Sequence, residues 1–124
     1  MSIAVKMAGL ALLFLLMIAS GIRLTKTGKP YNGAMYNAHK IISLIAVVLA
    51  GIGAYNLYRG ASGAGLLLLI LMMVAGVLFL FLLVSGGLLN TETQACNILR
   101  MGHRISSVLA VVLSIVVFFL LLKG

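Results

Sequence analysis

The sequence predicts an all-α integral membrane protein, a four-helix up-and-down bundle made of two helical hairpins. Three observations predict this fold class. The chain of 124 residues is 64% hydrophobic and only 8% charged, whereas soluble domains carry about 25% charged residues. Its apolar residues form four continuous runs, and motifs of the first half recur in the second. Continuous runs favour helices over the alternating strands of a membrane barrel.

Each apolar run is close to the roughly 20 residues that a bilayer-spanning helix needs. The runs cover residues 7–22, 41–57, 64–89 and 105–122. The first also resembles a secretory signal, with Lys6 before it and small residues at its end. We favour four membrane spans.

Polar residues predict where the second and fourth helices begin, well before their apolar runs. Pro30 suits the first turn of the second helix. Asn90, Thr91 and Gln94 resemble a helix cap and its capping-box partner for the fourth. The second and third helices are joined by a short tight hairpin at residues 59–63. Both histidines would then lie a few turns inside their helices.

An internal repeat relates the two halves of the chain. Residues 39–50 (HKIISLIAVVLA) match residues 103–114 (HRISSVLAVVLS) at an offset of 64, and residues 13–21 (LFLLMIASG) match residues 78–86 (LFLFLLVSG) at an offset of 65. The single domain, 1–124, therefore contains two hairpins, about 1–60 and 61–124. We expect an approximate two-fold axis along the membrane normal to relate them.

The net charge of +8 indicates membrane topology and not a nucleic-acid partner, because the cations flank the apolar runs. On one side lie Arg23, Lys26, Lys29, Lys40, Arg100 and Arg104; on the other lie Lys6, Arg59 and Lys123. The positive-inside bias predicts cytoplasmic loops at 23–40 and 90–104, with both termini outside a prokaryotic plasma membrane.

The only two histidines are the first residues of matching faces of the second and fourth helices. Steps of four, three and four residues keep one helical face. These faces are His39, Ser43, Ala46 and Ala50, and His103, Ser107, Ala110 and Ser114. Each face carries one imidazole above a column of small side chains. In an up-and-down bundle the two helices are diagonal, so we expect the imidazoles to confront each other.

Two facing imidazoles above small residues fit a flat iron macrocycle, a single haem b with His39 and His103 as axial ligands. Gly21 and Gly86 would let the ring edge approach the first and third helices. The candidate partners for the haem propionates are Arg23, Lys40, Arg100 and Arg104. No CxxCH motif is present, so the haem would be held without thioether bonds.

Other interpretations of the same residues stay open. Small residues at helical spacing commonly pack membrane helices, and a histidine near the interface is often an amphipathic anchor. Zinc or copper would need further ligands, and Cys96 is expected to be a small interfacial side chain. Methionine can ligate haem iron, but in a Met-rich chain Met17, Met72 and Met73 are expected to pack.

With its histidines at the cytoplasmic ends of alternate helices, the chain resembles the transmembrane cytochromes b, especially the cytochrome b561 and ferric-reductase-like cores. That resemblance implies a haem held by His39 and His103, in a pattern that covers the four-helix plan of the whole chain. Those families hold a second haem between the other two helices. Here the first and third helices carry no histidine, so we expect one haem.

The expected function is electron transfer, because two histidine ligands leave no open iron position for oxygen. Expected partners are the lipid bilayer and a quinone or redox protein, with loop 23–40 as the docking place; the chain could also form a homo-oligomer or join a larger membrane complex. No acid, base or nucleophile constellation is expected, because Glu92 is the only carboxylate side chain and the serines lie mostly in spans without a base. The alternatives are a small transporter or channel, which normally needs a carboxylate in a span, and a cofactor-free accessory subunit.

Overall fold

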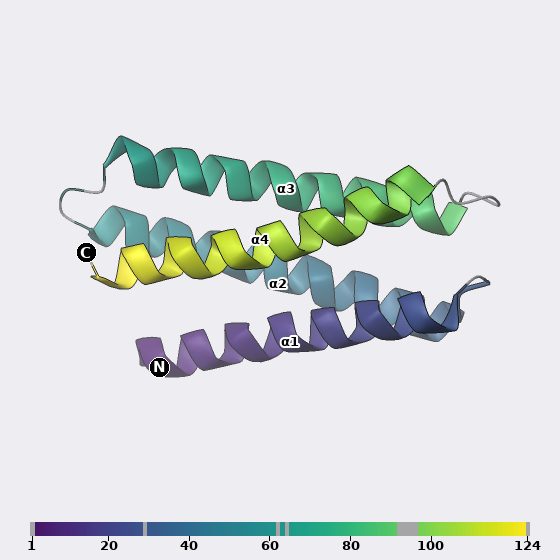
Figure 1. Cartoon of the computed structure of the whole chain (residues 1–124). Helices are drawn as coiled ribbons and strands as arrows, with labels where there is room; N and C mark the ends of the chain where they lie inside the picture. Colours follow the sequence, from purple (N-terminus) through teal and green to yellow (C-terminus); the bar gives the residue numbers. More distant parts are fainter. Residues whose placement is uncertain (1, 29, 62, 64, 92–96, 124) are drawn as a thin grey trace. The chain divides into compact units, whose positions relative to one another are not determined.

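The computed structural model describes residues 2–28, 30–61, 63, 65–91 and 97–123. Its four helices are α1 (Ile3–Thr27), α2 (Gly33–Gly60), α3 (Leu66–Thr91) and α4 (Asn97–Lys123), and the described residues contain no strand (Figure 1). All four helices are long and apolar enough to cross a membrane. The all-α membrane class and the four spans are therefore confirmed.

The helices are longer than the apolar runs that predicted them. They contain 25 to 28 residues, whereas a bilayer core of about 30 Å needs roughly 20. Polar flanks such as those around Arg23 and Lys40 continue the helices beyond the apolar runs. Helix α1 ends where Gly28 takes a positive φ of 69° and donates its backbone N–H to the carbonyl of Leu24, a common glycine C-terminal cap.

The start of α2 corrects the prediction for Pro30. The helix begins at Gly33, and Asn32 caps it: Asn32 Oδ1 accepts hydrogen bonds from the backbone N–H groups of Ala34 at 3.0 Å and Met35 at 3.2 Å. An asparagine side chain satisfies N–H groups that otherwise lack a partner at a helix start. Pro30 therefore lies before the helix and not in its first turn, because the better cap follows it.

The cap predicted for the fourth helix is also wrong in part. Asn90 and Thr91 belong to the last turn of α3, and α4 begins at Asn97. Gln94, the predicted capping-box partner, lies outside the described residues, as do Glu92 and Cys96. Leu88 and Leu89 continue the apolar run, and a membrane favours helix there because it leaves no backbone polar group unpaired.

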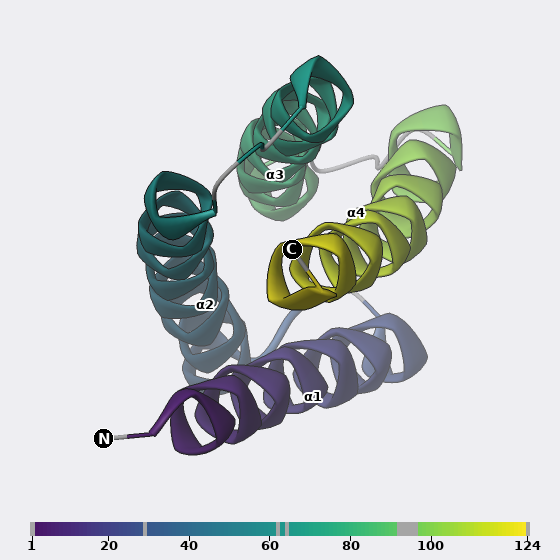
Figure 2. The same cartoon turned by 90° about the vertical axis from the view of Figure 1, so that its left-hand side faces the viewer.

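The chain divides into two compact units, Met1–Ala50 and Gly51–Gly124. The first contains α1 and the first part of α2, which run antiparallel (Figure 2). The second contains the rest of α2 with α3 and α4; here α3 and α4 pack against each other, and Gly53 of α2 faces the Phe118 ring of α4. The division falls inside α2, whereas the sequence repeat places its boundary near residue 60.

The exposed and buried side chains are those of a membrane protein. Large apolar side chains lie on the outside of the helices; Leu66 is 73% exposed and Phe119 is 64% exposed. Small residues are prominent among the buried ones, including Ala46, Ala110 and Ser85. Membrane helices pack through small residues and turn large apolar ones toward lipid, so the arrangement fits a bilayer.

Candidate ligand site: two serine–histidine pairs

Each histidine lies almost two turns inside its helix. His39 follows the first residue of α2 by six positions, and His103 follows the first residue of α4 by six. At 3.6 residues per turn both are beyond the unpaired N–H groups of the helix start. The prediction that the histidines lie inside their helices is confirmed, and the repeat preserves the position.

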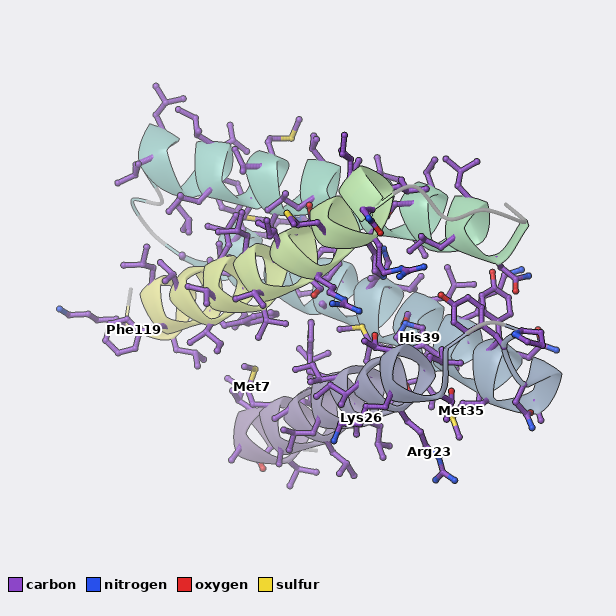
Figure 3. The ribbon with its side chains drawn as sticks, turned by 45° about the vertical axis from the view of Figure 1, so that its right-hand side comes forward. Met7, Arg23, Lys26, Met35, His39 and Phe119 are labelled. Atoms are coloured by element: carbon purple, nitrogen blue, oxygen red, sulfur yellow. The ribbon has the colours of Figure 1, made fainter. Side chains whose placement is uncertain are left out.

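In the first unit, His39 meets a serine of the neighbouring helix. Ser20 Oγ of α1 lies 2.8 Å from His39 Nδ1. The same hydroxyl donates to the backbone carbonyl of Met17, one turn earlier, at 3.0 Å. The backbone of Met17 also hydrogen-bonds the imidazole. In Figure 3 the His39 side chain of α2 lies beside α1. The ring is thus held against α1 through one nitrogen.

The second unit repeats this arrangement. Ser85 Oγ of α3 lies 2.7 Å from His103 Nδ1 and donates to the carbonyl of Leu82 at 3.3 Å. Ser85 is only 1% exposed. A buried hydroxyl is costly unless it is hydrogen-bonded, and this one has both a carbonyl and an imidazole. The two halves therefore share a contact between helices as well as a sequence.

The glycine that follows each serine makes room for the imidazole. A Cβ added at Gly21 would lie 3.0 Å from His39 Cε1, and one added at Gly86 would lie 3.3 Å from His103 Cε1. Both distances are shorter than ordinary van der Waals contact. The sequence predicts that these glycines admit a cofactor edge; the structure places the imidazole of the same unit against each of them.

The column of small residues beyond each histidine is buried. Ala46 and Ala110 are 0% exposed, and Ala50 and Ser114 are buried as well. Ser43 Oγ donates to the carbonyl of His39 at 2.6 Å, and Ser107 Oγ donates to the carbonyl of Arg104 at 2.7 Å. These hydroxyls are bonded to their own helices, so neither is the serine that contacts an imidazole.

The predicted propionate partners are placed differently from one another. Arg23, Lys40 and Arg104 are exposed, whereas Arg100 is half-buried. Lys40 and Arg104 directly follow the histidines, so their side chains leave the helix about 100° away from the imidazoles. Figure 3 shows Arg23 pointing away from α1 on the side opposite His39. The structure therefore does not bring Arg23 to the imidazole of its own unit.

Ser20 and Ser85 depart from the expectation that serines lie mostly in spans without a base, because each contacts an imidazole. A serine nucleophile also needs access to substrate and donors for the developing oxyanion. Ser85 is buried, and both serines lie inside helices whose backbone N–H groups bond the preceding turn. The geometry favours serines that orient the imidazoles.

The described residues contain no group of three or more His, Cys, Asp or Glu side chains that could hold a metal ion. A tetrahedral zinc or copper site built from protein ligands is therefore not found in the described part of the chain. Among the methionines considered as ligands, Met17 is buried, Met72 half-buried and Met73 is 65% exposed. The imidazoles are the donors suited to a cofactor that brings its own metal.

Comparison with protein-family models, curated proteins and solved structures finds no match to this chain. The likeness to transmembrane cytochromes b thus depends on the residues alone. Sequence reasoning missed the role of Ser20 and Ser85, although the Ser-Gly pairs at offset 65 were visible as part of the repeat. The repeated Ser-Gly pair identifies these serines as equivalent but does not predict which residues they contact.

Proposed function

We propose that this protein is a membrane-embedded electron carrier that binds one haem b, with His39 and His103 as axial ligands. The observation that carries the proposal is the duplicated serine–histidine pair, 2.8 Å in the first unit and 2.7 Å in the second. Ionisable side chains in membrane spans are costly and are usually kept for function. Here both are oriented by the same neighbouring residue type.

The chemistry of the donors fits a haem. Two imidazoles, each attached to a neighbouring helix through Nδ1, are the nitrogen donors of a six-coordinate haem protein. Ala46 and Ala110 supply small side chains about two turns beyond them. Such a haem cycles between ferrous and ferric iron and leaves no open position for oxygen, which favours electron transfer over oxygen chemistry.

The proposed electron partner is a quinone or a redox protein that docks at residues 23–40, where α1 ends and α2 begins. Tyr31 and Tyr36 stack there, with ring centroids 6.4 Å apart and an angle of 11° between the ring planes. Their flat surface, together with the exposed cation Lys26, suits an aromatic headgroup or an anionic protein surface. A homo-oligomer or a larger membrane complex is compatible with this role, and a transporter or a cofactor-free accessory subunit is the alternative function.

The test is a reduced-minus-oxidised visible spectrum of the protein purified in mild detergent from haem-replete cells. The expected result is a pair of sharp low-spin bands in the parent that vanish in both His39→Ala and His103→Ala, with one haem per chain. Asn37→Ala is the matched control, because Asn37 is exposed on α2 close to His39. A colourless parent would refute the proposal and favour transport or assembly.

A further inference from the structure

We propose that Ser20 and Ser85 fix the tautomer of the two histidines, so that Nδ1 carries the imidazole proton and Nε2 presents its electron pair. Both serines are positioning residues, since they act on a ligand through the histidine. What Nε2 binds depends on the proposed function; the tautomer does not.

The single proton of each serine hydroxyl determines this assignment. A serine hydroxyl has one proton, and a carbonyl oxygen can only accept. Ser20 Oγ lies 3.0 Å from the Met17 carbonyl, and Ser85 Oγ lies 3.3 Å from the Leu82 carbonyl. When each hydroxyl proton is donated to its carbonyl, the oxygen offers only lone pairs to the imidazole. Nδ1 must then be the donor, and the neutral ring carries no proton on Nε2.

The Met17 backbone also accepts a hydrogen bond from the His39 imidazole. The Ser20 oxygen, 2.8 Å from Nδ1, is thus one of two groups of α1 that can accept a hydrogen bond from the His39 ring.

The serine oxygens disfavour the alternative in which the ring turns over. A half-turn about the Cβ–Cγ bond exchanges Nδ1 with a carbon, which would replace the bond to serine by a C–H contact. Gly21 faces the Cε1 edge of His39, and Gly86 faces the Cε1 edge of His103. Each ring orientation is thus set by the serine at Nδ1, while the glycine leaves room for the ring beside it, and the same arrangement occurs twice.

This tautomer is the one a metal-binding histidine needs. The ligating nitrogen must be unprotonated, and the other ring N–H usually donates to a fixed acceptor, which orients the ring and raises its basicity. Loss of such an acceptor typically weakens metal binding by about 10- to 100-fold. Ser20→Ala and Ser85→Ala should each lower haem affinity by a factor in that range.

The tautomer can be measured without haem. The full chain is labelled with ¹⁵N-histidine, produced without haem supply, and purified in detergent; imidazole ¹⁵N shifts then distinguish protonated from unprotonated nitrogens. With only two histidines in the chain, His39→Gln and His103→Gln assign the two rings, because each variant removes the signals of one. Ser20→Ala and Ser85→Ala are then compared with the parent. Ser20→Thr keeps a hydroxyl at this position and should show the same tautomer as the parent. Thr27→Ala is the control, because Thr27 Oγ1 donates to the Arg23 carbonyl at 3.0 Å and forms no bond to a histidine.

The expected result is a protonated Nδ1 and an unprotonated Nε2 in both histidines of the parent at neutral pH, with a change of tautomer only in the ring whose serine is removed. A proton on Nε2 in the parent would overturn the inference. It would also be overturned if neither serine substitution changed the tautomer of a histidine.

If a serine variant does not fold, the spectra of the parent and of Ser20→Thr still decide. If the parent shows the expected tautomers but binds no added haem, this inference stands and the proposed function is refuted. If the parent binds haem but carries a proton on Nε2 in the haem-free chain, the proposed function stands and this inference is refuted.

Discussion

Gly21 and His39 approach each other so closely that a single added carbon would collide with the ring: a Cβ built on Gly21 lies 3.0 Å from Cε1, 3.6 Å from Nδ1 and 3.8 Å from Nε2 of His39. Cε1, the ring carbon between the two nitrogens, is therefore the imidazole atom nearest to this backbone position. At the matching pair, Gly86 and His103, the closest distance is 3.3 Å. The two units differ by a few tenths of an ångström in the room they leave.

This difference predicts unequal effects of adding a methyl group. Gly21→Ala should displace the His39 ring and lengthen its bond to Ser20, while Gly86→Ala should disturb His103 less. Overpacking typically costs about 1–3 kcal/mol, which corresponds to roughly 5- to 150-fold in haem affinity at 1.4 kcal/mol per factor of ten. Titration of haem into the purified variants measures the loss.

Neighbouring glycines provide the controls for that comparison. A Cβ at Gly9 or at Gly87 would have nothing within 4 Å, so Gly9→Ala and Gly87→Ala should bind haem like the parent. Equal losses in Gly86→Ala and Gly87→Ala would show that the helix backbone, and not the imidazole contact, is sensitive to the change.

The buried alanines should not tolerate a larger side chain. Ala110 is 0% exposed, and Ala110→Leu would force extra methyl groups into a packed region at a typical cost of about 1–3 kcal/mol in unfolding free energy. The same change should reduce haem binding if the small column provides the space for the ring. Val112→Leu, at a position that is 53% exposed, is the control. Full haem occupancy in Ala110→Leu would contradict the role of the column.

The cap at Asn32 should stabilise the start of α2. Asn32→Ala removes the acceptor for the N–H groups of Ala34 and Met35, and loss of an N-cap typically costs about 0.5–2 kcal/mol. Unfolding by a denaturing detergent measures the change against Asn37→Ala, which removes an exposed asparagine inside the same helix. If both variants lose the same stability, the cap has no special contribution.

The positive-inside bias predicts the orientation of the helices. On a Cys96→Ser background, Lys123→Cys should react with an impermeant maleimide on intact cells, while Thr27→Cys and Asn97→Cys should react only after permeabilisation. All three positions are exposed. The reverse pattern would invert the topology. Labelling of Thr27→Cys and Asn97→Cys from different sides would refute the four-span arrangement.

The cation beside each histidine should tune a bound haem. Lys40 and Arg104 are exposed and directly follow His39 and His103. A nearby positive charge favours ferrous over ferric iron, because reduction removes one positive charge from the centre. Lys40→Gln and Arg104→Gln should therefore lower the midpoint potential, as measured by spectroelectrochemistry. Lys26→Gln, an exposed cation of α1, should change it less; equal shifts in all three would indicate a general surface-charge effect.

The sequence alone determined the four membrane spans and the position of each histidine. Length and hydrophobicity of a run decide whether a segment can span, because in a bilayer each helix must satisfy its own backbone hydrogen bonds. The repeated phrase at 39–50 and 103–114 likewise placed His39 and His103 at equivalent helical positions. These are properties of single helices, which local sequence encodes.

The contacts between helices were decided only by the tertiary structure. Ser20 and His39 are 19 residues apart, whereas Ser85 and His103 are 18 apart; the repeat is interrupted by this difference, yet both pairs form the same bond. The contacts between two antiparallel helices depend on the length of their connection and on side-chain packing. The periodicity of a single helix predicts neither. The sequence therefore predicts an imidazole on each of two helices, but only the fold joins each imidazole to a serine and a glycine of the neighbouring helix.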